Sequence, residues 1–318
     1  CSAKDFEMGK HAQLVIGPAG SGKSSYCHAI HEHCLTQKRK VHMVNLDPAA
    51  EHFKYPVSID IRDLISLDDV SQELKLGPNG GLIFCMEYLI QNIDWLEDQI
   101  GQYNDDYLII DCPGQIELYS HIPVMKKLVS IFDKWGYRMC CVYLLDCTFI
   151  SDISKYVSGI LACLSGMIQL ELPHINLLTK IDLLDNTDVK DDNNDDNDLD
   201  DMHENMKLKL DDFLDPDLNL ISSKIKMECE INNVSDKYKL LTYAIIDLLK
   251  SYNMVSFLPM TIKNENNISN VLSHIDHAIQ YGEDKEPNDP DKWINDDVIQ
   301  YQYDKMNQLI SDNKSTHD

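Results

Sequence analysis

The stretch "LVIGPAGSGKSS" restricts the fold of this 318-residue chain more than any other feature. It matches the pattern G-x-x-x-x-G-K-[ST] at Gly17, Gly22, Lys23 and Ser24, between an apolar run and a helix-length segment. Glycines let the backbone curl so that its N–H groups face phosphates at the positive end of a helix. A strand–turn–helix with a chance lysine is the alternative. The sequence predicts a nucleoside triphosphate site whose phosphate-binding residues are Gly20, Ser21, Gly22, Lys23, Ser24 and Ser25.

Six short apolar runs are spread along the chain. They are continuous rather than alternating, which is typical of strands covered on both faces. Helix-length segments such as 24–37 and 154–170 lie between them, so strand and helix alternate and imply a parallel sheet. We expect an α/β fold of the three-layer P-loop NTPase type, G-domain-like, with a mostly parallel sheet. The expected strands are 12–17, 40–47, 106–114, 138–146, 174–182 and 254–260.

"DCPGQ", residues 111–115, follows one of these runs and fits D-x-x-G-Q. Asp111 is placed to hold a water on a metal ion, and Gly114 allows the backbone to approach a γ-phosphate. Gln115 has the position of the glutamine that orients the attacking water in GTPases. A strand that ends in a Pro-Gly turn is the alternative.

"TKID", residues 179–182, ends another apolar run. The Asp182 carboxylate can accept hydrogen bonds from the guanine N1–H and exocyclic amine, a donor pair that adenine lacks. Lys180 would lie along the base, and Thr179 stands where Asn is more frequent. A chance polar group at a strand end is the alternative, but after two phosphate motifs the pattern favours GTP over ATP.

"NLDPAAEHF", residues 45–53, carries Asp47 where a loop could reach the metal or the lytic water. Turn formation by Asp-Pro is the alternative function for this residue. The expected cofactors are GTP or GDP with Mg²⁺, and the expected metal-holding residues are Ser24, Asp47 and Asp111.

Charge and composition limit the partners. The 53 acidic residues exceed the 28 Lys and Arg and give a net charge of −25, which argues against direct nucleic-acid binding and an anionic membrane. The longest apolar run, 139–150, is too short to span a bilayer. The first twelve residues show no secretory signal, and the ten cysteines show no pairing or metal spacing. We expect a cytoplasmic protein with buried, reduced thiols.

We divide the chain into an N-terminal extension at 1–11, a nucleotide-binding domain at 12–284 and a polar tail at 285–318. Within the domain, residues 185–201 contain nine Asp, four Asn and one Lys, which predicts a disordered acidic insertion. A calcium site is the alternative, but the Gly and Glu of an EF-hand loop are missing.

"GPNGG", residues 77–81, reads locally as a tight turn before one helix over 82–100. Taken with the motifs described above, in this order and spacing, it resembles the GPN-loop GTPases. The similarity runs over residues 12–184 and resumes at 256–259 and 274–284.

This resemblance implies a dimer-dependent GTPase. Gly77, Pro78 and Asn79 of one subunit would reach the partner's site, where Asn79 stabilises the phosphate in transition. Only three arginines occur, and none of them lies in the motifs. We therefore do not expect an arginine finger in cis to stabilise the charge on the transferred phosphate. The implied catalytic residues are Asn79, Gln115, Asp47 and Asp111.

The resemblance also implies partners. The chain would form a homodimer, or a heterodimer with a GPN-loop paralogue, for which the first eukaryotic member is the expected mate. RNA polymerase II subunits are the implied clients, with a role in their assembly and nuclear import and shuttling to the nucleus.

The sequence departs from the expected pattern at two places, and two alternative functions remain open. Related dimeric ATPases have a lysine second in the P-loop, where this chain has Pro18, and the 185–201 insertion replaces an expected short linker. A GTP-bound assembly scaffold with negligible turnover is one alternative function. A P-loop kinase that phosphorylates an acceptor other than water is the other.

Overall fold

The computed structural model describes residues 9–103, 107–183, 210–216, 218–231, 235–252 and 254–282. Its centre is a seven-stranded sheet with the order β3-β2-β4-β1-β5-β6-β7, and every pair of neighbours is parallel. The strands are β1 (Lys10–Ile16), β2 (Val41–Asn45), β3 (Ile59–Asp60), β4 (Tyr107–Asp111), β5 (Tyr137–Asp146), β6 (His174–Thr179) and β7 (Leu258–Met260). The predicted parallel α/β sheet is confirmed. Strand β3 was not predicted, and β7 is shorter than the run at 254–260.

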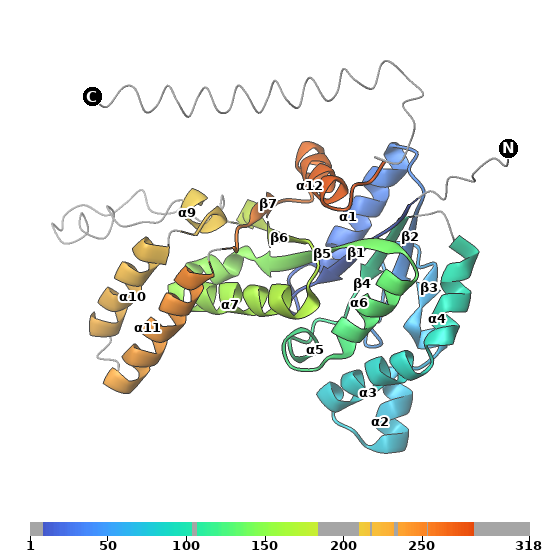
Figure 1. Cartoon of the computed structure of the whole chain (residues 1–318), viewed down its shortest axis with the longest axis horizontal. Helices are drawn as coiled ribbons and strands as arrows, with labels where there is room; N and C mark the ends of the chain where they lie inside the picture. Colours follow the sequence, from blue (N-terminus) through green and yellow to red (C-terminus); the bar gives the residue numbers. More distant parts are fainter. Residues whose placement is uncertain are drawn as a thin grey trace, which may run out of the picture. The chain divides into compact units, whose positions relative to one another are not determined.

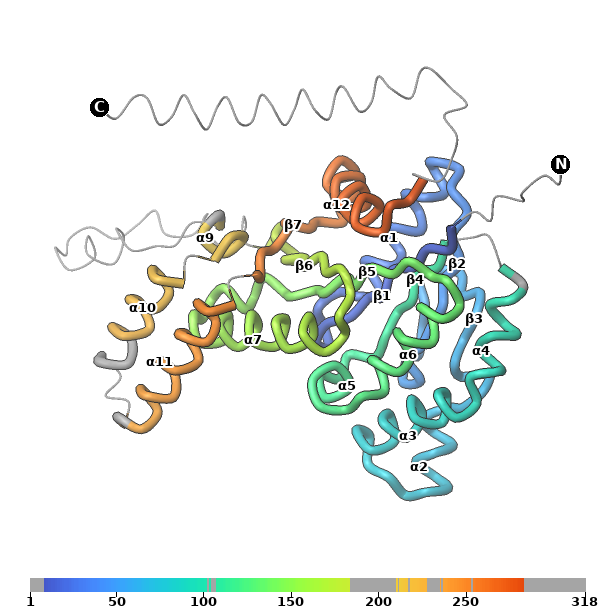
Figure 2. Tube along the Cα trace, viewed as in Figure 1, coloured from blue at the N-terminus to red at the C-terminus, as the bar shows by residue number. Residues whose placement is uncertain are grey.

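Helices cover both faces of the sheet and make three layers (Figures 1 and 2). Along β1, Leu14 and Ile16 belong to a core shared with α3, α4, α6 and α7, while Val15 faces a second core shared with α1 and α12. Because both faces are buried, the strands read as continuous apolar runs. The helices are α1 (Lys23–Thr36), α2 (Leu67–Leu74), α3 (Pro78–Gln91), α4 (Ile93–Ile100), α5 (Glu117–Ser120), α6 (Val124–Lys134), α7 (Ile153–Leu170), α9 (Asp211–Leu214), α10 (Leu218–Ile231), α11 (Asp236–Ser251) and α12 (Glu265–Ala278).

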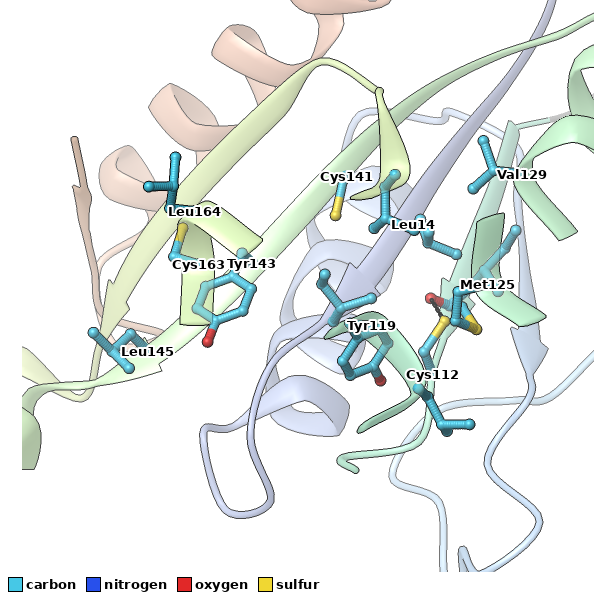
Figure 3. Close-up of a cluster of buried hydrophobic side chains, with 14 of the residues drawn as sticks. Leu14, Cys112, Tyr119, Met125, Val129, Cys141, Tyr143, Leu145, Cys163 and Leu164 are labelled. Carbon is cyan, nitrogen blue, oxygen red and sulfur yellow. Dashed lines mark hydrogen bonds between the residues drawn. The ribbon is translucent and has the colours of Figure 1, made fainter. Parts of the chain in front are cut away.

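Cysteines contribute to the larger of these cores as small apolar side chains. Figure 3 shows Cys112, Cys141 and Cys163 among Leu14, Tyr143 and their neighbours. Each of these three thiols is buried and unpaired, and burial raises the pKa of the Cys163 thiol. The expectation of buried thiols therefore holds for the described cysteines.

The expected single helix over 82–100 is wrong. Two helices, α3 and α4, occupy this stretch and are separated at Asn92, whose backbone angles of φ −114° and ψ 39° leave the helical region. The Asn92 amide also donates to the Tyr88 carbonyl at 2.9 Å, a local bond that competes with helix continuation. The expected tight turn at 77–81 is wrong as well, because Pro78 is already the first residue of α3.

Helix α7 is the one described helix that is long and apolar enough to cross a membrane, with 18 residues and a mean hydropathy of 1.3. Here it packs on the sheet, and Tyr156, Ile160 and Cys163 are buried in the core. A core helix meets the same criterion, so length and composition are weak evidence for a span.

The predicted domain limits are not tested by this structure, although residues 9–281 form one compact unit. The 185–201 insertion, residues 1–8 and the tail from 285 onward lie outside the described residues.

Candidate nucleotide-binding site

The P-loop joins β1 to α1 at the carboxyl edge of the sheet. Gly22 precedes α1 with φ 96°, a left-handed conformation that favours glycine. Lys23 opens the helix and is buried, and its Nζ donates to the carbonyls of Gly17 at 3.1 Å and Pro18 at 3.2 Å. Burial lowers the pKa of Lys23, while the negative charge of Asp111 opposes that shift. The P-loop backbone carbonyls thus hold the Lys23 ammonium group in place.

Close approach explains two of the glycines. At Gly17 the φ is +142°, and a Cβ would lie 2.4 Å from the Leu144 carbonyl oxygen. At Gly114 a Cβ would lie 2.9 Å from Lys23 Nζ and 3.0 Å from the Ala19 backbone nitrogen. The D-x-x-G segment is therefore seated directly against the P-loop, as the two motifs require.

Asp111 ends β4 and receives two hydroxyl donors on the same carboxylate oxygen. Ser24 Oγ donates to its Oδ2 at 2.8 Å, and Tyr55 OH donates to it at 2.7 Å. Burial raises the pKa of this carboxyl group, and the bonds from Tyr55 and Ser24 oppose the rise. A hydroxyl and a carboxylate in contact offer the hard oxygen donors that Mg²⁺ prefers, so these residues fit that ion.

Asp47 lies on the loop after β2 and acts partly as a turn residue, since its Oδ1 accepts from the Ala49 N–H at 3.0 Å. Its carboxylate is nevertheless near enough to affect the pKa values of Lys23 and Asp111. Burial raises the pKa of Asp47 itself. Within the described ranges no group of three or more His, Cys, Asp or Glu could hold a metal. Such a sparse set suits Mg²⁺, which keeps waters and substrate phosphates as ligands.

Gln115 follows Gly114, the residue that packs against the P-loop, and is half-buried. In the described part of the chain its Oε1 is buried without a hydrogen-bond partner. An unpaired buried acceptor is costly unless a ligand or water completes it. The oxygen is therefore suited to accept a hydrogen from an attacking water.

The residues of "TKID" are tied to the P-loop. Thr179 Oγ1 donates to the Ser21 carbonyl at 2.7 Å, and Lys180 Nζ donates to the Gly20 carbonyl at 2.8 Å. Lys180 also contacts Asp146 at 2.5 Å. The structure thus brings together two motifs about 160 residues apart along the chain.

Asp182 is half-buried in a short 3₁₀ helix, η4 (Ile181–Leu183), beside the β6 end. Its carboxylate contacts Lys263 Nζ at 2.5 Å, and that hydrogen bond lowers the pKa of Asp182. Lys263 comes from the loop after β7 and also lines a cavity of about 350 Å³ with Ser25 and His28. The carboxylate that the sequence predicts to read the base is therefore paired with a cation in this structure.

The "GPN" residues lie elsewhere. Gly77, Pro78 and Asn79 are exposed at the start of α3, which together with α2 extends from the body of the molecule (Figure 1). No hydrogen bond or ion pair within the described ranges joins Asn79 to its own P-loop. The structure does not bring Asn79 to the site formed by its own chain.

Tyr55 and Lys263 are site residues that the sequence did not reveal. Tyr55 has no motif signal, because an aromatic residue in a loop more often serves packing. Lys263 follows β7 by three residues, and the run at 254–260 was the only hint that a base-side loop begins there.

A phosphate loop, a metal-side carboxylate and a base-side motif meet at the carboxyl edge of one parallel sheet, and this arrangement defines a P-loop NTPase of the G-domain type. Comparison with solved structures agrees. A GTPase in apo form from Pyrococcus abyssi matches with a TM-score of 0.63 and 19% identity, over 84% of this chain and 97% of that one. At this identity the match shows the fold alone.

Sequence comparison defines the family. Residues 15–281 match a family model described as "Conserved hypothetical ATP binding protein". The chain is 50% identical over 283 residues to GPN-loop GTPase 3 of Dictyostelium discoideum, covering 89% of this chain and 92% of that protein. It is 48% identical over 288 residues to GPN-loop GTPase 3 of Danio rerio, with coverage of 89% and 92%. The chain belongs to the GPN-loop GTPase family.

Proposed function

We propose that the chain binds GTP with Mg²⁺ and hydrolyses it to GDP and phosphate. The observation that carries this proposal is the pair of bonds from Thr179 and Lys180 to the P-loop backbone, at 2.7 and 2.8 Å. These bonds support the proposal because they join residues 179 and 180, proposed to read the base, to the loop proposed to bind phosphate. The names of the relatives, which are GTPases, support the same activity.

Guanine is the proposed base although the family description names ATP. Asp182 already accepts a hydrogen bond from a cationic donor, Lys263. The N1–H and amine of guanine can replace that donor on the carboxylate, whereas adenine in the same place would displace Lys263 without supplying a donor pair. Guanine binding therefore displaces Lys263 from Asp182.

Each residue of the site then has a chemical role. Lys23 and the P-loop N–H groups would neutralise the phosphate charge, while Ser24 and Asp111 would hold Mg²⁺, which supplies charge neutralisation of the phosphates when bound. The unpaired Gln115 Oε1 would accept a hydrogen from the attacking water. Hydrolysis needs one further donor for the charge on the equatorial oxygens, and no arginine lies in these motifs.

The proposed donor is Asn79 of a second subunit. Its exposure at the start of α3 and the lack of a described contact with its own site support a role in trans. The mate would be a second copy or a GPN-loop paralogue, with the first family member preferred. Assembly and nuclear import of RNA polymerase II, and shuttling between cytoplasm and nucleus, are proposed from the family resemblance alone.

Base preference tests the proposal. Asp182→Ala removes the carboxylate proposed to read guanine, and we expect GDP affinity to fall about 100-fold with ADP affinity unchanged, because two hydrogen bonds to a charged group are lost. Isothermal titration calorimetry with GDP and ADP measures both. Asp133→Ala, at an exposed position on α6, is the matched control. Equal affinity of the unmodified chain for GDP and ADP would refute guanine specificity.

A further inference from the structure

We propose that Tyr55 is a positioning residue of the metal site, whose hydroxyl holds the Asp111 carboxylate and fastens the 46–58 loop to it. This inference rests on the proposed function, because Asp111 is the carboxylate assigned to Mg²⁺ there. It assigns a role to a residue outside every motif described above.

The contact is buried and crosses a long stretch of sequence. Tyr55 is 4% exposed, and its OH donates to Asp111 Oδ2 at 2.7 Å across 56 positions of the chain. Ser24 Oγ donates to the same oxygen at 2.8 Å. These two donors therefore act on one atom of the metal-side carboxylate, and together they fix how the carboxylate is rotated.

The far side of the same loop is anchored separately. The Phe53 ring lies 5.4 Å from the Tyr55 ring, and the Arg62 guanidinium lies 4.7 Å from the centre of Phe53. Arg62 Nη1 donates to the Ala50 carbonyl at 2.8 Å, and Arg62 also pairs with Asp60. Arg62 thus holds the outer side of the loop without touching Asp111.

The start of the loop has its own support. Asn45 Nδ2 donates to the Asp47 carbonyl at 3.1 Å and to Asp60 Oδ1 at 2.9 Å, and Asn45 Oδ1 accepts from the Asp47 N–H at 3.0 Å. Asp47 is therefore held by Asn45 whether or not Tyr55 keeps its hydroxyl. The Tyr55 hydroxyl is the loop's direct side-chain link to the metal-side carboxylate among the described contacts.

This arrangement makes the hydroxyl separable from the ring. Phenylalanine at position 55 would keep the packing against Phe53 and lose only the donor to Asp111. The carboxylate would retain the Ser24 donor and gain rotational freedom. Loss of an outer hydrogen-bond partner of a metal ligand typically weakens metal binding 10- to 100-fold.

The test is a titration of Mn²⁺, as a probe for Mg²⁺, into GDP-loaded protein by calorimetry. For Tyr55→Phe we expect Mn²⁺ affinity to fall about tenfold, while GDP affinity in the presence of EDTA stays within about twofold, since no phosphate or base contact is removed. Tyr156→Phe is the matched control. Tyr156 is also buried and donates through its hydroxyl, to the Phe213 carbonyl, far along the chain from the site.

The Arg62→Gln variant distinguishes the effect of the Tyr55 hydroxyl on metal binding from the effect of loosening the 46–58 loop. It removes the outer anchor and leaves the Tyr55–Asp111 contact, so we expect unchanged Mn²⁺ affinity. Thermal unfolding of each variant checks that the fold is retained. Unchanged Mn²⁺ affinity in Tyr55→Phe, or an equal loss in Arg62→Gln, would overturn the inference. Failure of the unmodified chain to bind GDP would instead overturn the proposed function.

Discussion

The phosphate side of the site and the "GPN" segment differ in how completely one chain supplies their contacts. Around Asp111, two hydroxyl donors and a close-packed glycine leave the carboxylate little freedom, and Lys23 is held by its own loop. Asn79 is exposed and has no described bond to that site. The first region has the contacts that the proposed phosphate and metal site requires, whereas the second presents a donor outward, which fits a site that is completed by another chain.

The largest effects are expected from substitutions that remove one functional group from either the phosphate side or the "GPN" segment. Lys23→Ala removes the phosphate cation and Asn79→Ala removes the proposed trans donor. Each should lower the turnover number about 100-fold, in line with the loss of one transition-state donor. GDP affinity should fall only in Lys23→Ala, because Asn79 is proposed to act on the transferred phosphate, which GDP lacks. Single-turnover hydrolysis and calorimetry measure the two quantities.

Mixing these two inactive variants sharpens the comparison. In a mixed dimer, one site combines an intact Lys23 with an intact Asn79 from the other chain. If the chain pairs with itself and subunits exchange freely, half of the dimers are mixed, and about a quarter of the sites recover. An Asn79→Ala variant mixed with itself is the control. Absence of any recovery in a mixture proven to contain mixed dimers would exclude donation in trans.

A moderate effect on stability is expected from removing the buried charge of Asp111. Burial raises the pKa of Asp111, so the folded state binds its proton more tightly than the unfolded chain does. Stability from this group is then lost as pH rises through and above 3.8, the ordinary value. Asp111→Asn removes that loss and should raise the stability of the ligand-free chain at neutral pH by about 1 kcal/mol.

Thermal unfolding as a function of pH checks this prediction. The stability gained by Asp111→Asn should be small near pH 4 and larger at pH 7, and Mg²⁺ binding to the GDP complex should be lost. Asp60 is the contrasting acid, because its bonds to Arg62 and Asn45 lower its pKa against the effect of burial. Asp60→Asn should destabilise the chain at neutral pH. A destabilised Asp111→Asn variant would contradict the inference that the charged Asp111 carboxylate lowers the stability of the ligand-free chain.

The smallest effect is expected at the base side. Lys263 is 71% exposed and competes with guanine for Asp182. Lys263→Ala should tighten GDP binding by up to about fivefold at low salt, because an exposed ion pair competes only weakly with the base. The gain should shrink as ionic strength rises. Lys126→Ala, which breaks an exposed pair with Glu171, is the control. Weaker GDP binding would show that Lys263 contacts the nucleotide instead.

Much of the site was predictable from local sequence because its parts obey local rules. The P-loop glycines, the Asp111 strand end and the residues at 179–182 each follow an apolar run, and the carboxyl ends of parallel strands meet at one edge. The helix break at Asn92 was not predictable in the same way. Both α3 and α4 have helix-forming sequences, and the break depends on an amide that bonds the Tyr88 carbonyl.

The order of motifs along the chain by itself determined the fold class, the phosphate site and the family, because these depend on strand ends and backbone turns that short segments encode. Only the tertiary structure placed the Tyr55 hydroxyl on Asp111 and the Lys263 ammonium on Asp182. Those contacts join residues 56 and 81 positions apart, and nothing in the short-range pattern of either segment specifies its mate. Chain packing brings such residues together, so their roles become visible only in three dimensions.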